Sequence, residues 1–194
     1  MAALTVTAVA FAVWAAALVG TLHTPAELRV AVAALTPPSL VLPPEPGPPP
    51  RTLTLVRLGT SERIDIVPFD RTGAPRTDAF ETLGRLFQPS SGHEVPIDPR
   101  LAELLIRISD KLGEPLILVS GHREPGRGTS KGSYHVRGMA ADIAVRGVGV
   151  QQLRRVALEL GAGGVGLYPG FIHVDVRDEP YRWVGGRWPR RTSR

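Results

Sequence analysis

The chain has 194 residues, of which 43% are hydrophobic and 21% charged, a balance typical of a folded globular protein rather than a disordered one. Its formal net charge of +5 suits an acidic partner such as nucleic acid, anionic lipid or a carboxylate-bearing polymer. The absence of cysteine excludes disulfides, zinc–thiolate sites and cysteine nucleophiles, so any metal must be held by His, Asp or Glu.

An uncharged, apolar segment opens the sequence. Residues 2–22 carry no charged side chain, and about 20 apolar residues are enough to cross a bilayer as a helix. We expect 1–22 to be a transmembrane anchor or a signal segment. No basic residue precedes it, unlike a normal signal peptide, and Arg29 would favour the opposite orientation. The chemistry of the downstream residues nevertheless favours export.

A proline-rich stretch follows the apolar segment. A short helix is expected at 26–35, and the run of prolines at 43–50 favours extended polyproline II, which acts as a semi-rigid spacer. We therefore expect residues 23–50 to be a linker that holds a folded domain away from a membrane. That domain would comprise residues 51–194.

The rest of the chain alternates strand and helix patterns. Asp98 followed by Pro99 predicts a helix start, and Gly113 a helix end. The order of elements predicts an α+β fold with a small antiparallel sheet and flanking helices. Strands are expected at 52–58, 63–67, 116–119, 142–145, 164–167 and 171–176, helices at 79–87, 98–113 and 150–160, turns at 59–61 and 168–170, and a flexible loop at 126–132.

Two histidines and two aspartates are the candidates for metal chemistry. His135 is expected in a loop that enters the strand carrying Asp142. Alternate strand residues share a face, so His173 and Asp175 point the same way. Two imidazoles and one carboxylate leave a fourth position open, the ligand count of a catalytic zinc site. By spacing alone this signal is weak, because a His-x-Asp strand is equally typical of a solvated face.

Four motifs follow one another along the chain: Ser-Gly-His-Arg at 120–123, Ser-x-His-x-x-Gly-x-Ala-x-Asp at 133–142, Gly-Val-Gly-x-Tyr-Pro at 164–169 and Phe-Ile-His-x-Asp at 171–175. Together they resemble the motifs of the M15-type zinc peptidases, and among them the YcbK-like branch of murein endopeptidases. The resemblance covers roughly 83–183 and implies an M15- or hedgehog-like fold. It also implies one zinc ion per chain, with His135, Asp142 and His173 as ligands.

The resemblance also assigns substrate contacts. Arg123, Ser133 and Tyr168 are expected to bind substrate. A guanidinium at a strand end can bind a carboxylate or stabilise a developing oxyanion, although Arg123 could also form only a surface salt bridge. Ser133 either orients the loop of His135 or caps a turn.

Two positions depart from the family pattern. His122 stands where the family commonly has tyrosine, and it is expected to point away from the site if Arg123 points into it. Gly170 stands where dipeptidase members place the acidic general base. Asp175 is the nearest replacement. It would act either as the catalytic base or as a carboxylate that orients a ligand.

The carboxyl-terminal region is basic. It is expected to be a solvated tail, with contact to anionic wall polymer or lipid as the functional alternative. Arginine next to tryptophan also suits nucleic acid, but the envelope-type amino terminus argues against that partner, and none is expected. The residues are Arg177, Arg182, Trp183, Arg187, Trp188, Arg190, Arg191 and Arg194.

Together these features predict an enzyme on the periplasmic side of the cell envelope. The resemblance implies a zinc metallopeptidase that hydrolyses peptide bonds in the stem peptides or cross-links of peptidoglycan, and the apolar amino-terminal segment implies a membrane as second partner. A D,D- or L,D-carboxypeptidase of the same fold remains an alternative. So does a non-catalytic, metal-containing module that binds the cell wall, which the glycine at position 170 favours.

Overall fold

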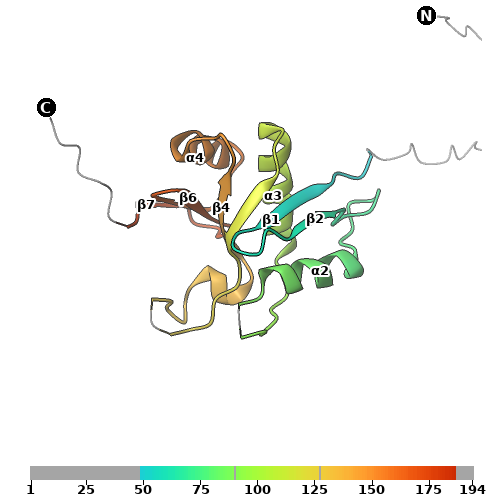
Figure 1. The fold of residues 1–194 in the computed structure, drawn as a ribbon, viewed down its shortest axis with the longest axis horizontal. Coiled ribbons are helices and arrows are strands. Elements are labelled where there is room, and N and C mark those ends of the chain that lie inside the picture. Colours follow the sequence, from blue (N-terminus) through green and yellow to red (C-terminus); the bar gives the residue numbers. More distant parts are fainter. Residues whose placement is uncertain (1–48, 90, 127, 187–194) are drawn as a thin grey trace, which may run out of the picture. The chain divides into compact units, whose positions relative to one another are not determined.

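A computed structural model describes residues 49–89, 91–126 and 128–186 (Figure 1). The predicted apolar segment 1–22 and nearly all of the linker 23–50 lie outside this part, so the domain boundaries remain predictions. Within the described part, no helix is both long and apolar enough to span a membrane. The elements are β1 (Leu53–Arg57), β2 (Arg63–Ile66), α2 (Thr77–Phe87), α3 (Pro99–Leu112), β3 (Leu116–Ser120), the 3-10 helix η1 (Tyr134–Arg137), β4 (Ala140–Val145), α4 (Val150–Glu159), β5 (Gly164–Tyr168), β6 (Phe171–Asp175) and β7 (Tyr181–Val184).

The strands form one sheet in the order β2-β1-β3-β4-β6-β5-β7. The α+β class is confirmed, but the expected small antiparallel sheet is a mixed sheet of seven strands. β1 pairs with β3 in parallel, and β5 pairs with β7 in parallel. The first parallel pair arises because the chain returns through α2 and α3 before entering β3. The second arises because β6 reverses the chain and β7 then adds on the other side of β5.

The predicted helix α3 has the capping residues that its sequence suggests. The Asp98 side chain accepts a hydrogen bond from the backbone N–H of Arg100 at 2.8 Å, and Pro99 occupies the first helical position. Gly113 ends the helix with φ of 68°, a left-handed conformation that glycine adopts without strain.

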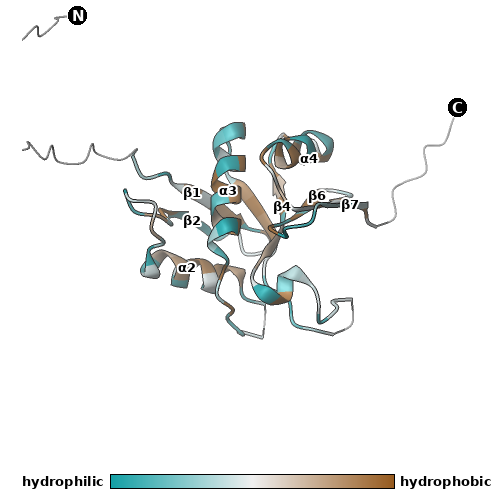
Figure 2. Ribbon diagram, turned by 180° about the vertical axis from the view of Figure 1, so that it is seen from behind, coloured by the Kyte–Doolittle hydropathy of each residue, from teal (hydrophilic) through white to brown (hydrophobic). Residues whose placement is uncertain are grey.

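The hydrophobic core covers one face of the sheet. Leu118 pairs with Ile143, and Ile143 pairs in turn with Ile172, so these buried side chains form a line across three strands. Helix α4 packs against β4, β5 and β6, and α3 packs against α4 and β1. In Figure 2 hydrophobic residues concentrate on the central strands, whereas the outer turns of the helices are hydrophilic. Because side chains alternate along a strand, Asp142 and His173 lie on the face opposite this core.

Strand β7 corrects the prediction of a solvated basic tail. Residues 181–184 pair with β5, and the guanidinium group of Arg182 donates hydrogen bonds to the carbonyl of Ala162 at 3.0 Å and to that of Gly163. The alternation of aromatic and basic residues at 181–184 is too short to predict a strand by itself. The segment becomes a strand because its backbone pairs with that of β5. The basic residues beyond position 186 lie outside the described part of the chain.

Candidate metal centre

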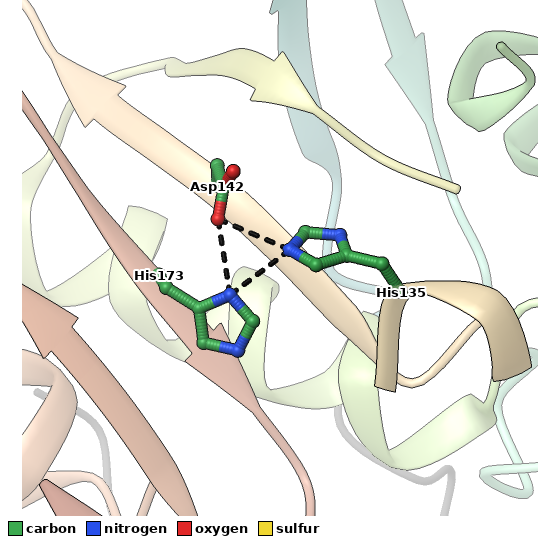
Figure 3. A group of neighbouring side chains, drawn as sticks. All are labelled: His135, Asp142 and His173. Atoms are coloured by element: carbon green, nitrogen blue, oxygen red, sulfur yellow. Dashed lines mark hydrogen bonds and ion pairs between the residues drawn. The ribbon is translucent and has the colours of Figure 1, made fainter. Parts of the chain in front are cut away.

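Three predicted ligands from three different elements meet at one point (Figure 3). Nε2 of His135 lies 2.9 Å from Nδ1 of His173 and 3.2 Å from Oδ1 of Asp142. Nδ1 of His173 lies 3.0 Å from the same oxygen of Asp142. All three side chains are buried, and they are the one group of three metal-binding side chains found among the described residues.

The sheet register and a tight loop bring these side chains together. Asp142 on β4 stands directly opposite His173 on β6, so their side chains share one face. His135 comes from η1, which Gly138 ends with φ of 69°. A Cβ at Gly138 would lie 2.1 Å from the carbonyl oxygen of Pro96, so only glycine lets the loop close here.

Hydrogen bonds on the outer side of each imidazole fix its tautomer. Nδ1 of His135 lies 2.6 Å from the carbonyl oxygen of Gly121, which can only accept, so Nδ1 carries the proton. Nε2 of His173 lies 3.0 Å from Oδ2 of Asp175, so that nitrogen donates to the carboxylate. When both imidazoles are neutral, the two remaining nitrogens therefore present lone pairs to each other and to Asp142.

This donor set fits a divalent cation such as zinc. Three lone pairs that face one another without a proton between them repel, and a cation removes that repulsion. Ligands about 2.0–2.1 Å from a tetrahedral zinc are about 3.3 Å apart, so the observed triangle of 2.9–3.2 Å needs only a slight opening. Two imidazoles and one carboxylate leave the fourth position for water or substrate.

Electrostatics favour an ionised carboxylate at the centre. Burial by itself would raise the pKa of Asp142, but hydrogen bonds with His135 and His173 and the charge of Arg123 outweigh burial and lower it. Burial would lower the pKa of His173, but its hydrogen bonds to Asp142 and Asp175 raise it. In the metal-free protein a proton on His173 is therefore the competitor of a metal ion.

Asp175 is tied to Arg177 on the side of His173 that faces away from the cluster. Oδ1 of Asp175 accepts from the backbone N–H of Arg177 at 3.1 Å and from its Nε at 2.8 Å. Burial raises the pKa of Asp175, but the hydrogen bonds from Arg177 and His173 outweigh it and leave the pKa lowered. These contacts favour the ligand-orienting role of Asp175 over the role of general base.

Arg123 reaches the centre from the end of β3. Its Nη2 donates to Oδ2 of Asp142, and its Nε donates to Oγ of Ser120 at 2.8 Å. The side chain is 38% exposed, whereas that of Asp142 is 2% exposed, so Arg123 joins the buried cluster to the surface. It is therefore more than a surface salt bridge, since one end of its guanidinium group contacts a predicted metal ligand.

The other predicted residues lie near the centre without joining it. Ser133 occupies the cap position before η1, although its side chain forms no capping hydrogen bond there. Tyr168 on β5 pairs with Phe171 on β6. Phe171 lies two residues before His173 on the same strand, so these three side chains share one face of the sheet. The ring of His122 lies 5.5 Å from that of His93, outside the cluster as expected.

Three contributions were not predicted. The carbonyl of Gly121 orients His135, and the guanidinium of Arg177 holds Asp175. The ring of Trp183 lies 4.9 Å from that of His173. In the sequence the pattern Arg-x-x-x-x-Arg-Trp at 177–183 indicates only a basic segment with an aromatic side chain, and no local signal connects it with His173.

Comparisons with known proteins agree with this geometry. The family model described as peptidoglycan L,D-endopeptidase MepK, of the M15 type, matches residues 45–182. Peptidoglycan L,D-endopeptidase MepK of Escherichia coli K12 is 36% identical over 142 residues, which are 66% of this chain and 78% of that protein. A probable enzyme of the same name from Haemophilus influenzae is 31% identical over 153 residues, 71% of this chain and 82% of that one. The chain therefore belongs to the M15-type peptidase family described as peptidoglycan L,D-endopeptidase MepK.

Proposed function

We propose that this protein is a zinc metallopeptidase that hydrolyses peptide cross-links of peptidoglycan, with the L,D specificity that the names of its relatives state. The main support for the proposal is that the side chains of His135, Asp142 and His173 converge on one point. In addition, the N–H group on the outer side of each imidazole already donates a hydrogen bond, to the carbonyl of Gly121 or to the carboxylate of Asp175. Zinc bound there would supply Lewis acidity and a water of lowered pKa.

The roles of the ligands follow from their surroundings. The carbonyl of Gly121 and the carboxylate of Asp175 hold the two imidazoles so that Nε2 of His135 and Nδ1 of His173 face the metal. Arg123 holds the second oxygen of Asp142, which leaves Oδ1 for the metal. Such orientation before metal binding lowers the conformational cost of assembling the site.

Asp175 acts in this proposal as a positioning residue, not as the general base. The hydrogen-bonding directions of the two imidazole nitrogens diverge widely, so a carboxylate bound at Nε2 of His173 points away from a water near Nδ1. Both oxygens of Asp175 are also occupied by Arg177. The proton acceptor of the reaction is then a group other than Asp175.

The substrate would lie on the site face of the sheet, next to the ligands. Ile117 on β3 pairs with Ala144 on β4, and Phe171 on β6 pairs with Tyr168 on β5. Since β4 and β6 are neighbours, these four half-buried side chains form a row across the sheet. This row supports the predicted substrate contact of Tyr168. Arg123 would bind a carboxylate of the stem peptide or the developing oxyanion, and Ser133 remains a proposed substrate contact.

We extend the proposal to the whole chain. Residues 1–22 would anchor or export the protein, and 23–50 would hold the peptidase domain 51–194 on the periplasmic side of the membrane, within reach of the wall. A tether of this kind restricts the enzyme to the layer of peptidoglycan next to the membrane.

Digestion of isolated sacculi tests the function. The full chain, purified in detergent, is incubated with sacculi rich in L,D cross-links, with and without a chelator, beside the His135→Ala variant. New muropeptides that disappear with the chelator and with the variant support the peptidase. Release of single terminal residues without cleavage of cross-links would identify a carboxypeptidase. Binding to sacculi without any product would identify a wall-binding module and refute the enzyme.

A further inference from the structure

Trp183 lies against a predicted metal ligand although it is distant from it in the sequence. Its indole ring lies 4.9 Å from the imidazole of His173, with an angle of 51° between the two planes. The two residues are on strands β7 and β6, and β5 runs between them. The indole therefore reaches across an intervening strand to touch the ligand.

Gly166 on β5 makes this reach feasible. It pairs with His173 on one side and with Trp183 on the other, so the three residues stand in one line across the sheet. A Cβ at Gly166 would lie 2.4–2.7 Å from three atoms of the indole, closer than carbon atoms can approach. The indole thus occupies the space that a side chain at position 166 would fill.

Two further contacts fix the indole in that space. Nε1 of Trp183 donates a hydrogen bond to the hydroxyl of Tyr168 at 3.0 Å, and the guanidinium carbon of Arg177 lies 5.7 Å from the ring centre. The Tyr168 ring is itself stacked on Phe171, with a centroid distance of 4.7 Å. A tryptophan held at its nitrogen and at its face has little rotational freedom.

We infer that Trp183 is a positioning residue of the metal centre: its indole packs against the imidazole of His173, while Asp175 holds the same imidazole at Nε2. Gly166 and Tyr168 act through Trp183 by giving it space and a hydrogen-bond partner. This inference rests on the proposed metal centre. It adds that the geometry of His173 is set from β7, two strands away.

Metal affinity of the full-length protein in detergent tests the inference without any assay of activity. Zinc is titrated in competition with a chromophoric chelator, and the absorption spectrum of the cobalt-loaded protein reports ligand geometry. Trp183→Leu is expected to weaken zinc binding about tenfold, as loss of an outer contact to a ligand commonly does, and to change the cobalt spectrum. Trp183→Phe, which keeps a ring, should lose less.

Gly166→Ala provides an independent variant in which Trp183 is still present but displaced. It should weaken zinc binding to an extent similar to Trp183→Leu. The double variant Gly166→Ala/Trp183→Leu should bind zinc no more weakly than Trp183→Leu alone, because the new methyl group then meets no indole. Gly149→Ala and Val184→Ala are matched controls, since a Cβ at Gly149 meets nothing within 4 Å and the Val184 side chain is 63% exposed.

The possible results separate this inference from the proposed function. Wild-type protein that binds no zinc or cobalt would overturn the metal centre, and this inference with it. Wild-type protein that binds zinc, with Trp183→Leu and Gly166→Ala binding equally tightly and giving the same cobalt spectrum, would overturn the role of Trp183 alone. Additive losses in the double variant would also overturn it, since Gly166 would then act by another route.

Discussion

His173 and Asp175 share one face of β6, and Nε2 of His173 lies 3.0 Å from Oδ2 of Asp175. This contact lies on the edge of the imidazole opposite Nδ1, which joins the cluster with His135 and Asp142. A carboxylate in that position raises the basicity of the imidazole and fixes its orientation, and it lies away from the side on which a metal ion would bind.

Asp175→Asn should therefore impair metal binding before it impairs chemistry. We expect zinc affinity to fall about tenfold, with activity restored by excess zinc, because the amide cannot replace the charge that orients His173. Chelator competition and kinetics at saturating zinc measure the two effects. Asp178→Asn, with a side chain that is 92% exposed, is the control. Unchanged zinc affinity together with a collapse of kcat would instead identify Asp175 as the general base.

Arg123→Lys should show whether the guanidinium geometry matters. Nε and Nη2 of Arg123 bind Ser120 and Asp142 at the same time, which a single ammonium group cannot do in the same geometry. We expect kcat/KM for cross-linked muropeptides to fall about 10²-fold. Arg85→Lys, on the exposed side of α2, should leave kcat/KM unchanged. Equal kcat/KM for wild type and Arg123→Lys would reduce Arg123 to a structural ion pair.

Arg177→Met should destabilise the fold in a pH-dependent way. Asp175 is fully buried and its pKa is lowered, so its ionisation stabilises the folded state above the unfolded pKa of about 3.9 and this contribution is lost as the pH falls. Without the guanidinium group the buried carboxylate keeps only His173 and one backbone N–H as partners, and the free energy of unfolding at neutral pH should drop by about 3 kcal/mol.

Urea unfolding of wild type and Arg177→Met between pH 7 and pH 3 measures this effect. The difference between the two proteins should be largest at neutral pH and should shrink towards pH 3. The exposed pair of Arg63 and Asp65 provides the control, because Arg63→Met should leave the free energy of unfolding nearly unchanged at every pH. A difference that is constant across the pH range would contradict the assigned role of the ion pair.

Metal binding should stabilise the folded protein. Zinc at about 100 times its Kd should add about 2.7 kcal/mol to the free energy of unfolding, because the unfolded chain does not bring the three ligands together. Calorimetry with zinc and with a chelator measures the shift in Tm. His135→Ala should abolish the shift, whereas His93→Ala, outside the cluster, should retain it. A shift that persists in His135→Ala would place the bound metal elsewhere.

The sequence alone determined those features that depend on neighbouring residues. Asp98, Pro99 and Gly113 defined the limits of α3, because capping and left-handed backbone are local properties. The two-residue alternation along β6 placed His173 and Asp175 on one face. The motifs at 133–142 and 171–175 indicate His135, Asp142 and His173 as ligands, because they resemble the motifs of a known family.

The tertiary structure decided what depends on groups that are distant in the sequence. Whether Asp175 serves as base or orienting group depends on which nitrogen of His173 it meets, and the pairing of β4 with β6 sets that choice. The parallel addition of β7 to β5 converts Arg177 and Trp183 from members of a basic tail into neighbours of the metal centre. Periodicity in one segment shows which side chains share a face, but it does not identify the strand that the segment will join, because pairing depends on packing against side chains that are distant in the sequence.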